Sequence, residues 1–149
     1  ADWAGEVDTR RSTSGGVMTI DSCYLLSWSR TQACASLSSA EAEYIAMVTA
    51  AQEALFVQHL TVELEVPLQI RLSSDSTAAL SSAEGGGVAH MKHMELRLLF
   101  LKDLVKAGVL QLQRVSSEAN VADCLTKAVP GHRLATCLRV ARCWTGVLS

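Results

Sequence analysis

The stretch SSAEAEYIA, from Ser38 to Ala46, opens the longest helical pattern in this chain of 149 residues. Ser38 and Glu41 have the spacing of a capping box, in which each side chain bonds the other residue's backbone amide. Small and apolar side chains follow at positions three and four residues beyond Glu43, and this periodicity continues to about Leu64. The sequence therefore predicts a long helix that begins near residue 39 and carries Glu43 early along its length.

The carboxylate of Glu43 has two interpretations. A lone charge on an apolar helix face is costly to bury unless it is paired or binds a cation. An acid in the first turn is also stabilised by the helix dipole, without any function. The spacing alone favours the interpretation of Glu43 as an acid stabilised by the helix dipole. The other motifs of the chain are needed to choose between the two interpretations.

Composition predicts one folded domain. Hydrophobic residues make up 49% of the chain and charged residues 19%, which is typical of a globular protein. No apolar run reaches membrane-spanning length, so we expect no transmembrane helix. The sequence has no initiator Met and no signal-peptide pattern, which predicts an intracellular fragment of a longer protein. Five cysteines without a CxxC pair indicate reduced thiols.

Charge is distributed unevenly along the chain. Residues 1–90 carry four Lys/Arg and eleven Asp/Glu, a net charge of −7. Residues 91–149 carry nine Lys/Arg and four Asp/Glu, a net charge of +5, so the whole chain has −2. An acidic part suits metal ions and a basic part suits a polyanion, although ordinary surface charge is the alternative.

The N-terminal third reads as antiparallel strands. Residues 17–20 and 24–29 form an expected hairpin, and residues 1–5 read as the end of another strand. After the long helix, residues 68–72 alternate as a short strand that delivers Asp75 near its carboxyl end. Sites in α/β sheets lie beyond such strand ends, although Asp75 alternatively caps the helix that follows.

The C-terminal half alternates helix and strand again. Residues 91–106 read as a helix ended by Gly108, and residues 109–115 as the last strand. A short helix then carries Asp123, which is alternatively a solvated surface acid, and Pro130 stops this helix. The order predicts a mixed α/β protein.

Short motifs recur along the chain in a fixed order. They are Ala1-Asp2-Trp3-Ala4-Gly5, Thr9-Arg10-Arg11-Ser12-Thr13-Ser14-Gly15, Ser27-Trp28-Ser29, Ser38-Ser39-Ala40-Glu41-Ala42-Glu43-Tyr44, Asp75-Ser76, Lys92-His93 and Ala122-Asp123-Cys124-Leu125-Thr126-Lys127. Together they resemble the ribonuclease H domain of copia-type LTR retrotransposon polyproteins. The resemblance implies a ribonuclease H-like α/β fold over residues 1–130, with a mixed five-stranded sheet, a truncated first strand and a long central helix. Residues 131–149 are then a basic tail or an extra helix.

The resemblance also implies a site of four carboxylates. Glu43, Asp75 and Asp123 match the family's acidic positions, whereas Glu41 does not. The family motif reads Ser-Asp-Ala-Asp-Trp-Ala-Gly, and Asp2 matches its second aspartate rather than the catalytic first one. Side chains two residues apart on a strand share a face, so Asp2 is carried over as a partial substitute. Two Mg²⁺ ions are the implied cofactors, with Mn²⁺ as an alternative.

The implied activity is endonucleolytic hydrolysis of the RNA strand of RNA–DNA hybrids during reverse transcription. Lys92, His93 and Arg97 are the candidate nucleic-acid contacts. The reverse transcriptase domain of the same polyprotein is the other implied partner, no membrane is involved, and a cytoplasmic particle or the nucleus is the implied location.

Two departures from the family pattern matter. Asp75-Ser76 stands where the family usually has Asp-Asn, and residues 114–120 lack the histidine that many ribonucleases H use. The alternatives are therefore a catalytically inactive fragment that still binds hybrids, and an unrelated α/β protein.

Overall fold

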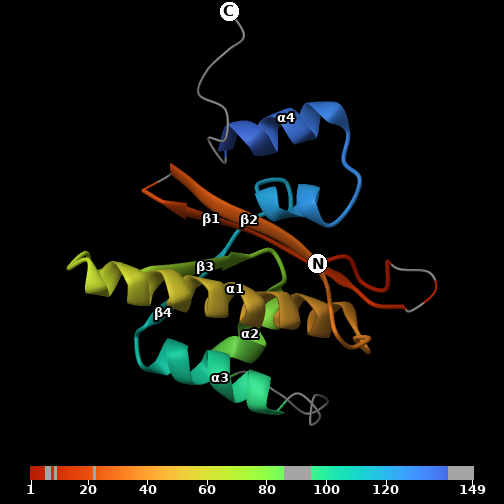
Figure 1. The fold of residues 1–149 in the computed structure, drawn as a ribbon. Helices are drawn as coiled ribbons and strands as arrows, with labels where there is room; N and C mark the ends of the chain where they lie inside the picture. The colour runs from red at the N-terminus through yellow and green to blue at the C-terminus, as the bar shows by residue number, and fades with distance from the viewer. Residues whose placement is uncertain (6–7, 9, 22, 86–94, 141–149) are drawn as a thin grey trace, which may run out of the picture. The chain divides into compact units, whose positions relative to one another are not determined.

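The chain forms two compact units in a computed structural model that describes residues 1–5, 8, 10–21, 23–85 and 95–140. The first unit combines Ala1–Ser39 with the residues from Ser116 onwards, and the second unit is Ala40–Val115. The elements of both units are labelled in Figure 1. The mixed α/β class predicted from the sequence is confirmed.

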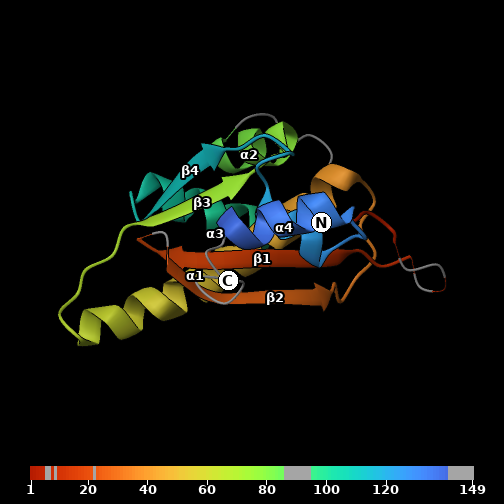
Figure 2. The ribbon, with the colours of Figure 1, turned by 90° about the horizontal axis from the view of Figure 1, so that it is seen from above.

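An antiparallel hairpin forms the N-terminal part of the first unit. Strands β1 (Thr13–Ile20) and β2 (Cys23–Thr31) pair along their length, with a register shift between Met18 and Thr19. Figure 2 shows the two strands side by side. The predicted hairpin is therefore confirmed, and both strands are longer than expected.

The expected strand at residues 1–5 is reduced to a single bridge. Asp2 makes an isolated antiparallel bridge to Thr13, and its amide donates to the Thr13 carbonyl at 3.1 Å. Ala4 has a φ of 52°, a left-handed backbone conformation that interrupts an extended chain. The three-stranded start predicted from the sequence is thus wrong for the described residues.

The C-terminal part of the first unit contains two short helices. The 3₁₀ helix η2 (Val121–Leu125) begins at Asn120, whose side chain accepts from the Ala122 amide at 3.2 Å. The Ser29 hydroxyl of β2 donates to the Leu125 carbonyl at 2.6 Å, and this contact ties the hairpin to η2.

Pro130 begins a helix rather than stopping one. Its carbonyl accepts from the Arg133 and Leu134 amides in the first turn of α4 (Gly131–Val140). Proline suits a helix start because the amide it lacks has no intrahelical partner there. The prediction that Pro130 ends the preceding helix was wrong, because η2 already ends at Leu125 and Pro130 leads into α4. The domain boundary at residue 130 stays a prediction.

Helix α1 (Ser39–Glu63) dominates the second unit and matches the predicted helix within a residue. It ends in a Schellman motif: the Val66 amide bonds the Thr61 carbonyl at 2.8 Å, and the Glu65 amide bonds Val62 at 2.9 Å. Glu65 has a φ of 59°, in the left-handed region where glycine is normally found.

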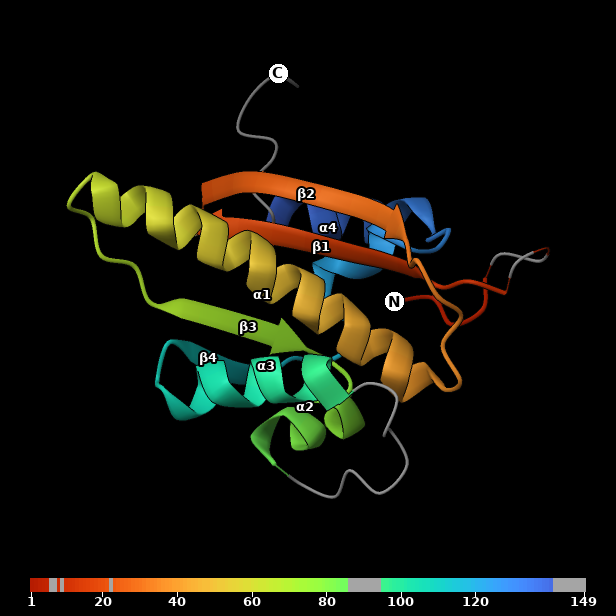
Figure 3. The same cartoon turned by 60° about the horizontal axis from the view of Figure 1, so that its bottom comes forward.

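A parallel β-α-β connection completes the second unit. Strand β3 (Ile70–Ser74) pairs in parallel with β4 (Leu110–Arg114), and the connection contains α2 (Thr77–Glu84) and α3 (Glu95–Lys106). Figure 3 shows α2 and α3 in this crossover. The predicted strand at residues 68–72 is displaced by two residues, and residues 91–94 of the predicted helix lie outside the described residues.

The core of the second unit is formed by α1, β3, α2, α3 and β4. Its buried members are Tyr44, Ile45, Met47, Val48, Ala51, Ile70, Leu72, Ala79, Leu80, Ala83, Leu98, Leu101 and Leu110. The Tyr44 hydroxyl donates to the Leu98 carbonyl at 3.1 Å, which satisfies the polar end of a fully buried ring.

The described residues form two sheets of two strands each, β1–β2 and β3–β4. The sequence predicted one mixed sheet of five strands, and this expectation was wrong for the described residues: residues 1–5 contribute a bridge instead of a strand, and the other four strands pair only within β1–β2 and β3–β4. Among the described residues, no helix has the length and apolar character needed to cross a membrane.

Candidate metal-binding carboxylates

The four candidate carboxylates are divided equally between the two units. Glu43 and Asp75 belong to the second unit, and Asp2 and Asp123 belong to the first. Within the described residues, no group of three or more His, Cys, Asp or Glu side chains is gathered as a metal site. The four-carboxylate site therefore stays a prediction, and each carboxylate is characterised within its own unit.

Glu43 lies in the second turn of α1 and is half-buried. Its neighbour Glu41 is more deeply buried, with 3% of its surface exposed. Glu41 does not match an acidic position of the family, and its burial was not predicted from the sequence. The two acids of the motif thus differ in burial, and Glu43 is the more exposed of the two.

Asp75 directly follows the last residue of β3, as predicted, and is half-buried. The cap of α2 is the next residue, Ser76, whose hydroxyl accepts from the Ala79 amide at 3.3 Å. The Ser76 amide in turn donates to the Ser74 hydroxyl at 3.2 Å. The interpretation of Asp75 as a helix cap was wrong, because serine at the family's asparagine position performs this task.

Asp2 directs its carboxylate to its own loop. One carboxylate oxygen accepts from the Thr13 amide, and a Cβ placed on Gly5 would lie 2.0 Å from the other oxygen. In the structure Asp2 thus holds the chain start against β1. Its role as a partial metal ligand stays a prediction.

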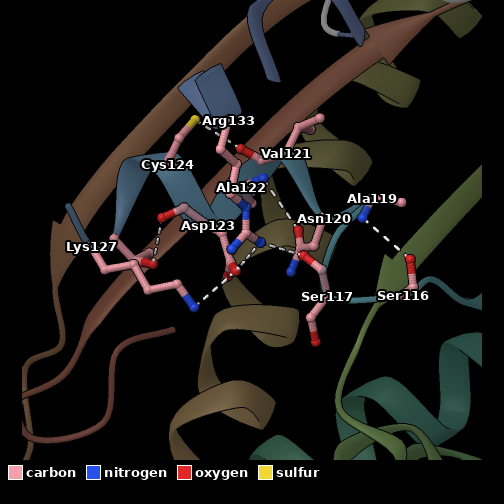
Figure 4. Close-up of polar contacts among 11 residues, drawn as sticks. Ser116, Ser117, Ala119, Asn120, Val121, Ala122, Asp123, Cys124, Lys127 and Arg133 are labelled. Carbon is pink, nitrogen blue, oxygen red and sulfur yellow. Dashed lines mark hydrogen bonds and ion pairs between the residues drawn. The ribbon is translucent and has the colours of Figure 1, made fainter. Parts of the chain in front are cut away.

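Asp123 is buried and carries two ion pairs. Only 5% of the residue is exposed. Its Oδ2 atom lies 2.8 Å from Lys127 Nζ and 3.0 Å from an NH2 nitrogen of Arg133, as Figure 4 shows. The alternative that Asp123 is a solvated surface acid was wrong.

The local backbone explains the first of these ion pairs. The amides of Thr126 and Lys127 donate to the Asp123 carbonyl at 3.1 and 3.2 Å, so the chain turns once around Asp123. This turn brings the side chain four residues on back to the carboxylate. The i,i+4 spacing of Asp123 and Lys127 is the signal in the sequence that indicates this ion pair.

Arg133 reaches Asp123 from the next helix. The same NH2 nitrogen also donates to the Ser117 carbonyl at 2.6 Å. Nε of Arg133 is buried and has no hydrogen-bond partner among the described residues. No local pattern in the sequence indicates this contact, because it depends on the helix that starts at Pro130.

A thiol pair lies beside this cluster. The Cys124 thiol donates to the Val121 carbonyl at 2.9 Å. Burial raises the pKa of the Cys124 thiol, and the neighbouring Cys137 thiol raises this pKa further. Both cysteines are unbridged, as the composition predicted, and burial keeps Cys124 in its unreactive protonated form.

The candidate nucleic-acid contacts are described only in part. Arg97 is exposed on α3. Lys92 and His93 lie outside the described residues. These three assignments remain predictions.

The donor chemistry of the acidic residues suits a hard cation. Mg²⁺ takes oxygen ligands and prefers carboxylates, which Glu43, Asp75 and Asp123 supply. At Asp123 one oxygen is already shared by two cationic side chains, so a metal ion at that oxygen competes with them.

The chain has relatives among the Pol polyproteins of plant retrotransposons. It is 32% identical over 140 residues to the retrovirus-related Pol polyprotein from transposon TNT 1-94 of Nicotiana tabacum, which covers 92% of the chain and 10% of the relative. It is 31% identical over 131 residues to the corresponding polyprotein from transposon RE2 of Arabidopsis thaliana, which covers 85% of the chain and 9% of the relative.

A third similarity covers a smaller part of the chain. The secreted RxLR effector protein 161 of Plasmopara viticola is 48% identical over 59 residues, which are 38% of the chain and 40% of the effector. No family model matches the chain, and no solved structure matches it. The chain is thus similar to a segment of retrotransposon Pol polyproteins and spans about a tenth of the length of these relatives.

Proposed function

We propose that the chain is a ribonuclease H that hydrolyses the RNA strand of RNA–DNA hybrids with the aid of two divalent cations. The observation that carries the proposal is the position of Asp75. This carboxylate follows the carboxyl end of a parallel strand, and Ser76 relieves it of the task of capping α2. Strand ends of this kind are where α/β proteins place their functional groups.

The remaining acids support the same chemistry. Glu43 in α1 and Asp123 in η2 both lie on regular elements rather than on loop tips, and rigid elements hold metal ligands accurately. Two Mg²⁺ ions about 4 Å apart stabilise the attacking and leaving oxygens of a phosphodiester. The chain's own contribution is to supply and orient the oxygen ligands.

The proposed substrate follows from the relatives and from the charge distribution. Pol polyprotein relatives imply a retroelement setting, in which RNA–DNA hybrids arise by reverse transcription. The net charge of +5 beyond residue 90 suits a nucleic-acid backbone, and the 2′-hydroxyls in a shallow groove distinguish RNA from DNA. We propose the reverse transcriptase domain of the same polyprotein as the partner that supplies the hybrid.

A second candidate function is binding of hybrids without cleavage. Two observations favour it: the Asp2 carboxylate is engaged by the Thr13 amide, and Asp123 is engaged by Lys127 and Arg133. Glu43, Asp75 and an ion-paired Asp123 should hold two cations less firmly than four carboxylates without such competitors. Binding through the basic residues does not need these acids at all.

Cleavage of a labelled hybrid separates the two candidates. The chain is incubated with Mg²⁺ and an RNA–DNA hybrid, with a DNA duplex of the same sequence as the control. If the chain is the proposed enzyme, it should cleave only the RNA strand of the hybrid, and EDTA should abolish this cleavage. Binding of the hybrid without any cleavage would favour the second candidate. If the chain neither cleaves nor binds the hybrid, both candidates are rejected.

A further inference from the structure

The charge cluster around Asp123 points to a control element in α4. We propose that Arg133 competes with a divalent cation for the Asp123 carboxylate, so that α4 acts as an autoinhibitory latch on this acid. The inference rests on the proposed function insofar as it takes Asp123 to be a metal ligand. The parts of the latch are Asp123, Lys127, Arg133 and Ser117.

Both cationic side chains occupy the same carboxylate oxygen. Lys127 Nζ and Arg133 NH2 lie 2.8 and 3.0 Å from Oδ2 of Asp123. The Asp123 side chain is 6% exposed, so the carboxylate itself is largely shielded from water and its interactions are screened less than those of an exposed acid. A divalent cation that binds Oδ2 of Asp123 is repelled by the positive charges of Lys127 and Arg133, which both contact this oxygen. At least one of the two side chains has to move away before the cation binds.

The two cations differ in how firmly they are held. The Lys127 side chain is 50% exposed and reaches Asp123 from the neighbouring turn of the same segment. The Arg133 side chain is 30% exposed and is held at a second point, because its NH2 nitrogen also donates to the Ser117 carbonyl at 2.6 Å. Arg133 is therefore the more firmly anchored competitor, and it comes from α4.

The latch can open only by movement. A guanidinium does not lose its proton in proteins, so a change of pH cannot remove the charge of Arg133. Its Nε atom is buried with no hydrogen-bond partner among the described residues, and a buried donor without an acceptor is unfavourable. Release of Arg133 to solvent would satisfy this donor, which partly offsets the lost ion pair and makes opening accessible.

Two other roles for Arg133 make different predictions. If Arg133 only anchors α4, its removal lowers stability and leaves metal affinity unchanged. If Arg133 positions Asp123 for the metal, its removal weakens metal binding. Only the latch predicts that metal binding becomes tighter when the charge is removed.

The test measures Mn²⁺ binding by the free-ion EPR signal for the chain and its variants. Arg133→Gln is expected to bind Mn²⁺ about three- to tenfold more tightly, the effect of one removed charge near a protein surface. Arg133→Lys keeps the charge and should stay within twofold of the unmodified chain. Arg139→Gln removes an exposed charge from the same helix and is the matched control.

A further variant assigns the gain to the carboxylate. Asp123→Asn combined with Arg133→Gln should abolish the tighter binding, and far-UV circular dichroism checks that each variant is folded. Unchanged or weaker Mn²⁺ binding by folded Arg133→Gln overturns the latch. Hybrid cleavage is measured separately, so that cleavage without the gain rejects only the latch, and the gain without cleavage rejects only the proposed nuclease.

Discussion

The indole ring of Trp28 lies directly over the α-carbon of Gly16, its partner on the neighbouring strand. A Cβ added to Gly16 would lie 2.1 Å from Trp28 Cζ2 and 2.5 Å from Cη2. Trp28 is 8% exposed, so the ring has little room to move away. The pair explains why a glycine stands in the middle of β1, where glycine is otherwise unfavourable.

Gly16→Ala should therefore destabilise the fold by about 1–3 kcal/mol, the usual effect of overpacking. Urea unfolding followed by tryptophan fluorescence measures the change. Gly131→Ala is the control, because nothing lies within 4 Å of its added Cβ. If both variants unfold at the same urea concentration, the close packing of Trp28 on Gly16 is wrong.

Asp75→Asn should abolish hybrid cleavage in Mg²⁺ and leave the fold intact. The α2 cap is Ser76, so the substitution removes a charged ligand without removing the cap of the helix, and far-UV circular dichroism should show a folded chain. Ser76→Ala is the matched control, with a loss of about 1 kcal/mol from the missing cap and retained cleavage.

Equal cleavage by the chain and by folded Asp75→Asn would show that Asp75 is not a metal ligand.

Glu65→Gly should stabilise the second unit. Glu65 ends α1 with a φ of 59°, a conformation that costs a non-glycine residue roughly 1–2 kcal/mol. Glycine loses more backbone entropy on folding, so a net gain of about 0.5–1 kcal/mol is expected. Gln52→Gly in the exposed middle of α1 should instead cost about 1 kcal/mol, and thermal unfolding distinguishes the two signs.

Stability should fall between pH 10 and pH 12 because of Tyr44. Burial raises the pKa of Tyr44 from 10.0 to about 12, so the unfolded phenol loses its proton first and the unfolded state is favoured as pH rises. The contribution is fully present below pH 10, and about 1.4 kcal/mol should be lost by pH 11. Urea unfolding of the chain and of Tyr44→Phe at pH 9 and pH 11 checks this. A variant with the same pH dependence as the unmodified chain would rule out Tyr44 as the cause.

Arg97→Gln should weaken hybrid binding about equally for hybrids of different sequence. Backbone contacts position a nucleic acid without reading bases, and each lost contact lowers the slope of log K against log salt by roughly one. Fluorescence anisotropy over a range of salt concentrations measures both. Arg71→Gln, an exposed arginine in the acidic part of the chain, is the control. A sequence-selective loss would contradict the assignment.

Local patterns in the sequence predicted the elements well. The capping-box spacing placed the start of α1, and the alternation of residues 109–115 placed β4, since both signals depend on neighbouring residues alone. The position of Asp75 just after β3 followed from the same kind of evidence.

Contacts between distant residues were less accessible. The strand expected at residues 1–5 is interrupted at the left-handed Ala4, and the ion pair of Arg133 depends on the helix that starts at Pro130. The residues next to Ala4 and Arg133 in the sequence do not indicate the left-handed backbone of Ala4 or the ion pair of Arg133. The four-carboxylate site draws on both units, and for this reason it rests on the family resemblance rather than on measured geometry.

The hydrogen bond from Ser29 to Leu125 has a consequence for synthesis on the ribosome, because 96 residues separate its partners. At roughly 5–20 residues per second, η2 emerges about 5–20 s after β2. A two-stranded hairpin is marginally stable by itself in water. The nascent hairpin is therefore exposed without η2 for this period. Slower translation between β2 and η2 would lengthen the time in which the hairpin is open to chaperones and to aggregation.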